Sequence, residues 1–313
     1  MDVIQVTPEE FTSIIKQPRY IYTCTDFNAL NAYKCDCVYY LLFKDEHYRM
    51  GIIGGIKNKI FHSPFSAPFG GFSFLREDIR LTYIEEAIDS LTNWTRNHHF
   101  SDIIITLPPS AHDQSQLSKF INCLFRKSFK VINIDLSYYY NLEKFNDTYI
   151  DQIWKEGRNN LRKSFVNQLT FNCCTNFNEK FIAFDIIRQN KEAHSYPLHL
   201  CFDQIIETSN IIDCDFFLVR DRHSEPIASA IVFHVTSDIV QVIYWGDLRE
   251  YGNLKPMNFL SFKIFEYYKL IGKKMVDLGP STCESAPNYG LCVFKESIGC
   301  DITTKFSFTI RFC

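Results

Sequence analysis

A lysine within an apolar stretch is the residue of this chain best suited to chemistry at a carbonyl group. Lys295 follows Phe294 in the run Val-Phe-Lys-Glu-Ser, inside a predicted helix from 288 to 298. An ammonium there can stabilise the negative charge that develops on a carbonyl oxygen when an amine attacks an ester. The alternative is a lysine that extends its charge into solvent at a helix edge. If Lys295 is catalytic, we expect its ammonium to be accessible.

Two arginines have the spacing of an anion-binding stripe. Arg158 and Arg162 lie one turn apart on a predicted helix from 150 to 168, and Lys155 precedes Arg158 by three residues. Side chains spaced in this way share one helix face. Such a stripe can hold a diphosphate or a carboxylate through bidentate contacts, which makes both arginines candidate substrate-binding residues. A solvated helix face accounts for the same pattern.

A short polar loop joins a predicted strand (239–245) to a predicted helix (256–272). It contains Arg249, Gly252 and Asn253, which are candidate cofactor-binding residues, and it ends in Leu254. A strand–loop–helix junction points backbone N–H groups and the positive end of the helix dipole at one place, which suits a phosphate or an oxyanion. An ordinary turn is the alternative.

The corresponding loop in the first half, residues 63–72, is rich in Pro, Gly and Phe. Loops at the end of a sheet commonly carry ligand-binding residues, so this loop is a candidate for substrate binding. Its candidate contacts are Ser63, Phe65, Gly70 and Gly71. The phenylalanines can instead fill a seam between the two halves.

Two further residues lie just before and at the start of the helix that carries Lys295. Tyr289 is a candidate for positioning substrate, whereas Asn288 is better suited to capping the helix. His234, in an apolar strand, is expected to be a core histidine with a hydrogen-bond partner.

Composition limits the classes of function. The chain has 313 residues, of which 46% are hydrophobic, and a net charge of −3, so we expect one large or two medium domains and no DNA-binding field. Any RNA contact must be a local patch. Twelve scattered cysteines without a Cys-x-x-Cys pair indicate neither disulfides nor a metal site. The sequence lacks an N-terminal signal and a membrane span, so we predict a reduced, cytoplasmic protein.

The order of predicted elements repeats along the chain. Strands and helices of the first half recur in the second at offsets between about 171 and 180 residues, which is the mark of a duplication. We therefore expect an N-terminal domain, 1–145, and a C-terminal domain, 146–313. The second domain would comprise a helical lead-in (146–210) and a sheet core (211–313). A short strand is also predicted at 20–23.

Three segments resemble FemAB-like peptidyltransferases. KLIGKKMVDLGPS (269–281) and NYGLCVFKESIG (288–299) are similar to the C-terminal domain of that family, and EGRNNLRKSF (156–165) resembles the arginine-containing helix that opens it. The resemblance implies an α/β (α+β) fold of two tandem GNAT-like domains. Each would be a mixed, twisted sheet flanked by helices, in which two central parallel strands splay apart.

The same resemblance implies a function. FemAB-like enzymes move an amino acid from aminoacyl-tRNA onto an amine of a peptidoglycan precursor, use no bound cofactor, and are thought to use a lysine in the motif of Lys295. We therefore expect an N-acyltransferase or aminoacyltransferase acting on a cell-wall or related peptide or amino-sugar acceptor, in a cleft between the copies.

Two alternatives remain open. Many GNAT enzymes bind coenzyme A through Gln/Arg-x-x-Gly-x-Gly/Ala, and this chain has Leu254 at the last position, so acyl-CoA is the second candidate donor. A coenzyme A-dependent N-acetyltransferase is thus one alternative. A catalytically silent module that binds a peptide or saccharide is the other, because a fold does not fix a function.

Overall fold

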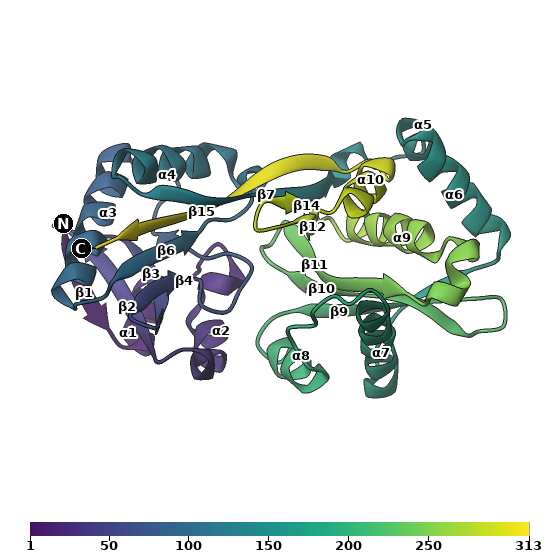
Figure 1. Ribbon diagram of the computed structural model, residues 1–313, viewed down its shortest axis with the longest axis horizontal. Helices are drawn as coiled ribbons and strands as arrows, with labels where there is room; N and C mark the ends of the chain where they lie inside the picture. The colour runs from purple at the N-terminus through teal and green to yellow at the C-terminus, as the bar shows by residue number, and fades with distance from the viewer. Residues whose placement is uncertain (313) are drawn as a thin grey trace. The chain divides into compact units, whose positions relative to one another are not determined.

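The computed structural model describes residues 1–312, which form two compact units. Unit 1 comprises Met1–Leu136, Glu284–Ala286 and the chain from Thr303 on; unit 2 comprises Ser137–Cys283 and Pro287–Ile302. Each unit has a mixed β-sheet with helices on both faces (Figure 1).

The sheet of unit 1 has one parallel pair of neighbouring strands among antiparallel ones. Its strands follow the order β1-β2-β3-β4-β6-β15, β5 also pairs with β3, and β4 and β6 are the parallel pair. The elements are β1 (Asp2–Val6), α1 (Pro8–Ile14), η1 (Ile21–Thr23), α2 (Thr25–Leu30), η2 (Ala32–Lys34), β2 (Cys37–Lys44), β3 (Tyr48–Lys57), β4 (Ile60–Ser63), β5 (Phe72–Phe74), α3 (Leu81–Asn97), β6 (Asp102–Thr106), η3 (Ser110–His112) and α4 (Gln114–Arg126).

The sheet of unit 2 repeats this arrangement. Its strands follow the order β7-β12-β11-β10-β9-β8, with β11 and β12 parallel. The elements are η4 (Leu142–Lys144), α5 (Tyr149–Gln152), α6 (Lys155–Val166), β8 (Thr170–Cys173), α7 (Phe177–Ala193), α8 (Phe202–Ser209), β9 (Cys214–Arg220), β10 (Pro226–His234), β11 (Ile239–Asp247), η5 (Arg249–Leu254), α9 (Pro256–Leu270), β12 (Met275–Pro280), β13 (Thr282–Cys283), β14 (Ala286–Pro287) and α10 (Tyr289–Ser297).

The two long strands exchange partners between the copies. β7 (Lys130–Asn141) follows α4 in the chain, yet its last residues pair with β12 in unit 2. β15 (Asp301–Arg311) follows α10, yet it pairs with β6 in unit 1. The predicted duplication is confirmed, because the remaining strands have the same order in both units. The order of elements along the chain does not indicate that the last strand of each copy pairs in the other unit.

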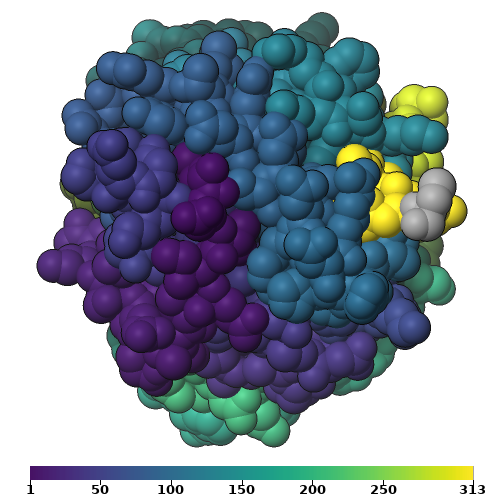
Figure 2. All heavy atoms as spheres, turned by 90° about the vertical axis from the view of Figure 1, so that its left-hand side faces the viewer, coloured from purple at the N-terminus to yellow at the C-terminus, as the bar shows by residue number. Residues whose placement is uncertain are grey.

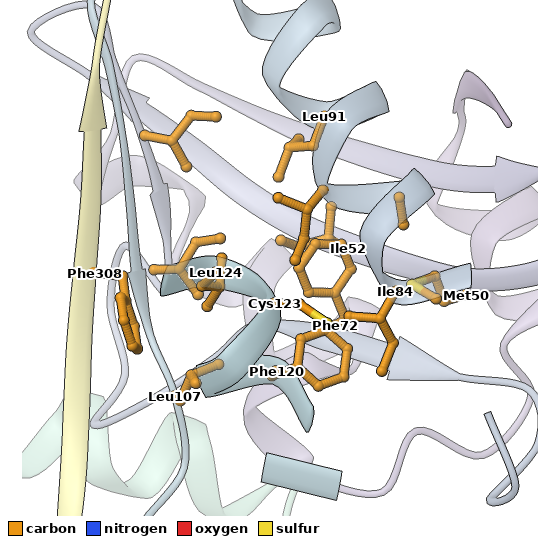
Figure 3. Packing of buried hydrophobic residues seen from close by; sticks show 14 of the residues in the cluster. Met50, Ile52, Phe72, Ile84, Leu91, Leu107, Phe120, Cys123, Leu124 and Phe308 are labelled. Atoms are coloured by element: carbon orange, nitrogen blue, oxygen red, sulfur yellow. The ribbon is translucent and has the colours of Figure 1, made fainter. Parts of the chain in front are cut away.

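In unit 1, α3 and α4 bury one apolar face each. Ile84, Ala87, Ile88 and Leu91 recur at helical spacing on α3, and all are at most 1% exposed. Figure 3 shows this core, in which Ile84 and Leu91 of α3 lie over Met50 and Ile52 of β3. Each of the three Ile and Leu side chains contributes on the order of 1.5–3 kcal/mol when it is fully buried.

The N-terminus is tied to α3. The Ser90 hydroxyl donates to the Met1 carbonyl, and the Met1 ammonium lies 3.9 Å from the Glu86 carboxylate. Figure 2 shows the dark purple N-terminal residues beside segments coloured blue on this face. The first strand is therefore held at both its sheet edge and its helix side.

Two details of the sequence prediction are wrong. Residues 21–23 form the 3-10 helix η1 rather than a strand, although Tyr, Ile and Thr favour strands locally. The predicted helix 150–168 is two helices, because the chain between α5 and α6 is extended at Ile153 and Trp154. The predicted helix of 256–272 is confirmed as α9, which packs on α6, β10 and β11.

Candidate functional site

The parallel strands β11 and β12 of unit 2 separate after three paired positions. Ile239 to Gln241 pair with Met275 to Asp277, after which β11 continues to Asp247 and β12 to Pro280 without further pairing between them. The last rung is reinforced by the Gln241 side-chain amide, which donates to the Asp277 carboxylate at 2.7 Å. We call the place where the pairing stops the notch.

Lys295 of α10 holds the end of β12 on one side of the notch. Its Nζ donates to the carbonyl oxygens of Leu278 (2.8 Å), Gly279 (2.9 Å) and Pro280 (3.2 Å), so all three N–H groups are used. The side chain is 1% exposed, so the expectation of an accessible ammonium is wrong. The ammonium can be buried because three backbone carbonyls replace the water molecules that it loses.

Burial also changes the acidity of Lys295. Desolvation lowers the pKa of its ammonium to about 8, and this effect exceeds the opposing influence of Cys300 and Asp277. Its Nζ lies 5.4 Å from the ring centre of Tyr138, whose hydroxyl donates to Glu296 at 3.0 Å. Burial raises the pKa of Tyr138, so this hydroxyl remains protonated. The lysine is mainly a cation at neutral pH, in surroundings of low polarity.

Helix α6 joins α10 to the loop after β11. A side chain at Gly157 would come within 2.1 Å of the Ser297 carbonyl oxygen at the end of α10, so only glycine fits this approach. At the other end of α6, the Asn167 side-chain amide donates to the Leu254 carbonyl at 3.1 Å. The structure therefore brings the helix of Arg158 and Arg162 beside the helix of Lys295 and the loop of Arg249.

The two arginines of α6 differ in their surroundings. Arg158 is half-buried, 3.9 Å from the Asp151 carboxylate, and one Nη contacts the Ile153 carbonyl at 3.5 Å. Arg162 is exposed. The two arginines therefore differ in exposure and do not form one equivalent stripe.

The loop from Arg249 to Leu254 is coiled into the 3-10 helix η5. Its Tyr251 amide donates to the Leu248 carbonyl, and the Lys255 amide donates to the Gly252 carbonyl. A side chain at Gly252 would meet no atom within 4 Å, so no close approach requires glycine there. Arg249 and Asn253 are exposed. In this conformation two amides of the junction face the loop itself rather than a ligand.

The open end of β11 carries residues that the sequence did not single out. Asp247 ends the strand, and burial raises the pKa of its carboxyl group. The Asn190 side-chain amide of α7 donates to the Asp247 carbonyl at 2.8 Å. Lys191 follows Asn190 on α7, and burial lowers the pKa of its ammonium group. This ammonium lies 5.5 Å from the ring centre of Tyr196. An acidic residue at the end of an apolar strand is a signal by which the sequence could have indicated Asp247 as a site residue. No signal in the sequence indicates that α7 contributes to the site.

The start of α10 agrees with the sequence. The Asn288 side chain accepts a hydrogen bond from the Leu291 amide, so it caps the helix as predicted, and its own amide donates to the Tyr196 hydroxyl at 2.7 Å. Tyr289 is 76% exposed and available to a ligand. His234 has the partner expected of a core histidine, since its Nε2 lies 2.7 Å from Asp215.

In unit 1 the candidate loop after β4 is used by the fold itself. The Ser63 hydroxyl donates to the Ile53 carbonyl and accepts from the Gly71 amide, and the Gly70 amide donates to the Thr106 carbonyl. Phe65 lies over Gly55, where a side chain would meet the Phe65 ring at 2.6 Å. The loop therefore covers the backbone beyond the parallel pair of β4 and β6.

Residues 1–312 show neither a cluster of metal ligands nor a helix that could span a membrane. They contain no group of three or more His, Cys, Asp and Glu side chains arranged to hold a metal ion. None of the helices in this range has the length and apolarity needed to cross a membrane.

Comparison with known proteins shows the fold. No family model and no curated protein matches this sequence. Among solved structures, FemX is similar at 12% identity over 100% of this chain and 98% of that chain, with a TM-score of 0.72. L-PGS from Bacillus licheniformis is similar at 11% identity over 97% and 92% of the two chains, with a TM-score of 0.61.

A tandem GNAT protein from the clavulanic acid biosynthesis pathway is also similar. The identity is 6% over 99% of this chain and 98% of that chain, and the TM-score is 0.53. The chain therefore has a FemAB-like tandem GNAT fold, as the sequence resemblance implied.

Proposed function

We propose that this chain, with its FemAB-like tandem GNAT fold, transfers an acyl or aminoacyl group onto an amine at the notch of unit 2. The supporting observation is the separation of β11 and β12 directly after Gln241 and Asp277, beside the buried cation of Lys295. Backbone groups between the separating strands can hold an extended acyl chain, and a fixed positive charge favours the anionic intermediate of acyl transfer.

In this reaction the amine nitrogen attacks the carbonyl carbon of an ester. A C–N bond forms, the C–O bond to the carrier breaks, and the carrier oxygen leaves with a proton while the amine loses one. Asp247 is the proposed acceptor of the amine proton, because its raised pKa makes it a stronger base than an ordinary carboxylate. Lys295 is the proposed positioning residue: it fixes the end of β12 and adds its charge from a site shielded from water.

Aminoacyl-tRNA is the proposed donor. Leu254 stands where coenzyme A-binding loops have Gly or Ala, and two amides of the junction are bonded within η5 and its flanks. Both features disfavour a pyrophosphate at this loop. The proposed acceptor is an amine of a cell-wall or related peptide or amino sugar, on the basis of the likeness of 269–281 and 288–299 to FemAB-like enzymes. Arg162 and Tyr289 are exposed and are proposed to contact it.

The test is a transfer assay with radiolabelled aminoacyl-tRNA and a panel of amines that includes UDP-linked peptide precursors. We expect Asp247→Asn to reduce kcat by about 10²–10⁴-fold, the usual contribution of a general base. The matched control is Asp203→Asn, an exposed carboxylate on α8, which should leave kcat unchanged. In the unmodified protein kcat/KM should rise as the pH rises through the pKa of Asp247. An unchanged kcat in Asp247→Asn excludes this residue as the base.

A coenzyme A-dependent N-acetyltransferase is the second candidate, because β11, η5 and α9 form the junction at which GNAT enzymes bind coenzyme A. Calorimetry with acetyl-CoA separates the two. We expect no binding by the unmodified protein and measurable binding by Leu254→Gly. Tight binding of acetyl-CoA by the unmodified protein would favour acyl-CoA over aminoacyl-tRNA as the donor. Ligand-induced thermal stabilisation by the amine panel, without transfer from either donor, favours the binding module instead.

A further inference from the structure

A hollow in unit 1 brings together cationic and aromatic side chains from α3, from the start of β6 and from the end of β15. Its volume is about 640 Å³, within the range of roughly 300–1,000 Å³ that is usual for small-molecule sites. It is lined by Arg96, His99, Phe100, Ser101, Arg311 and Phe312. These residues adjoin the rung of Ile60 and Asp102, where the parallel pair of β4 and β6 begins, whereas the loop of 63–72 follows the other end of that pair. The hollow therefore shares no residue with the candidate loop of unit 1 or with the notch.

The two arginines of the hollow keep N–H groups for a ligand. Arg96 packs on the Phe312 ring, with its guanidinium carbon 4.9 Å from the ring centre, and no carboxylate of residues 1–312 pairs with it. Arg311 is 84% exposed, and its Nε donates to the Asp102 carboxylate at 2.9 Å, so the two Nη groups are not used by this carboxylate. Asp102 compensates one of the two positive charges and leaves the other uncompensated. Guanidinium groups bind phosphate through paired N–H groups, so this arrangement suits a phosphate.

The C-terminal end of α3 opposes an anion in the hollow only weakly. Unpaired carbonyls at the end of a helix carry partial negative charge. Here the Thr95 carbonyl accepts from the Phe100 amide at 3.2 Å. The Arg96 carbonyl accepts from the His99 amide at 2.9 Å. Because these carbonyls are paired within the chain, the positive charge of Arg96 in the last turn of α3 is available to a ligand.

Two phenylalanine rings supply the apolar part of the lining. Phe100 and Phe312 are both half-buried, so part of each side chain remains accessible. Their backbone is held in place, because the Phe312 amide donates to the Ser101 carbonyl at 2.8 Å. The Ser101 amide donates in turn to the Lys59 carbonyl at 2.8 Å. A phosphate alone gains nothing from these rings, whereas a planar base can stack on them.

We propose that this hollow binds a nucleoside monophosphate, whose phosphate contacts Arg96 and Arg311 and whose base lies on the phenylalanine rings. The uncompensated arginine charge supplies the anion contact, and the rings supply a stacking surface that accepts any base, since every base has a flat apolar face. The affinity then depends on both parts of the nucleotide. Nothing in this site takes part in the proposed acyl transfer, so the inference goes beyond that function.

Calorimetry with the full chain tests the two parts of the ligand separately. The probes are AMP, adenosine, which lacks the phosphate, and ribose 5-phosphate, which lacks the base. We expect AMP to bind about tenfold or more tightly than either of the others, since one loses the charge-assisted hydrogen bonds and the other loses the stacking. Equal affinity for AMP and ribose 5-phosphate would show that the rings take no part. Equal affinity for AMP and adenosine would show that the arginines take none, and either result, or no binding of AMP, overturns the proposal.

A variant and a salt titration attribute the binding to the hollow. Arg96→Gln should weaken AMP binding about tenfold or more and leave adenosine binding unchanged. Arg76→Gln is the matched control, because Arg76 is an exposed arginine of unit 1 that pairs with Asp78 and does not line the hollow. In the unmodified protein, added salt should weaken the binding of AMP but not of adenosine. Unchanged AMP affinity in Arg96→Gln, or AMP binding that is insensitive to salt, overturns the proposal.

None of these measurements involves acyl transfer. Failure of AMP to bind therefore leaves the proposed function intact, and absence of transfer leaves the nucleotide site intact.

Discussion

The parallel strand pairs of the two units end differently, although they arise from the same element order. In unit 1 the loop after β4 returns to the sheet, and Gly70 donates to the Thr106 carbonyl directly beyond the last paired residue, Ile105. In unit 2 the chain after β11 leaves the sheet through η5, and the end of β12 is held by Lys295. One copy covers its backbone with its own loop, and the other keeps a buried cation beside it.

The same difference between the units is found in the helices after the second parallel strand, which are α4 after β6 and α10 after β12. Lys295 is the seventh residue of α10, and Phe120 is the seventh residue of α4. Both are almost fully buried, but Phe120 packs among apolar side chains, whereas Lys295 binds three carbonyls. A duplicated scaffold thus retains an apolar core residue in one copy and a charged one in the other. The proposed transfer reaction uses a positive charge beside the notch, which is why we propose it for unit 2.

Replacing the charged residue tests this contrast most strongly. Lys295→Met should lower turnover by about a hundredfold or more, because the positive charge beside the notch is lost. It should also reduce stability by roughly 1–3 kcal/mol, since three carbonyls lose their donor and removal of the buried charge offsets only part of that. Transfer rates and Tm measure the two effects. Lys269→Met, on the exposed side of α9, is the control; unchanged turnover in Lys295→Met would remove the lysine from the mechanism.

The loop of unit 1 should be more sensitive to an added methyl group than any loop at the notch. A side chain at Gly70 would lie 2.7 Å from the Pro64 backbone nitrogen and 3.0 Å from the Ser63 carbonyl carbon, and backbone atoms cannot move aside cheaply. Gly70→Ala should therefore destabilise the protein by about 1–3 kcal/mol. Chemical denaturation measures this value. A neutral result would mean that the loop does not cover the sheet tightly.

The pH dependence of stability distinguishes the buried cation from the buried phenylalanine. The pKa of Lys295 is about 8 in the folded protein and 10.5 in an exposed lysine. Between these values the unfolded chain binds more protons than the folded one, so this group makes stability rise with pH, by at most about 1.4 kcal/mol per unit. The stability difference between the unmodified protein and Lys295→Met should therefore widen from pH 8 to 10.5. A narrowing difference would mean that the carbonyls raise the pKa instead.

The smallest effect is expected at the loop of unit 2. Gly252 has no atom within 4 Å of where a side chain would begin, and its backbone does not adopt a positive φ. Gly252→Ala should change the Tm by little more than the error of a scanning calorimeter, in contrast with Gly70→Ala. A large loss of stability would show that η5 adopts another conformation in which glycine is required, such as a ligand-binding loop.

The amino-acid sequence by itself determined most of the elements and their order, with the exceptions of η1 and the break between α5 and α6. Periodicity located α9, turn residues separated the strands, and Asn288 was recognised as a cap because a capping side chain acts on an amide three residues away. The repeated order of elements and the FemAB-like segments gave the tandem fold. All of these signals are local, because helix and strand propensities and capping side chains act on residues a few positions away in the sequence.

The tertiary structure decided the properties that depend on distant segments. The sequence did not reveal that β7 and β15 exchange sheets, because strand partners are chosen by complementary edges rather than by order. The sequence correctly placed Lys295 on a helix but predicted an accessible ammonium. The ammonium is buried because it binds carbonyls of β12, which are more than ten residues away in the sequence. For the same reason, the raised pKa of Asp247 appears only once remote segments are packed together.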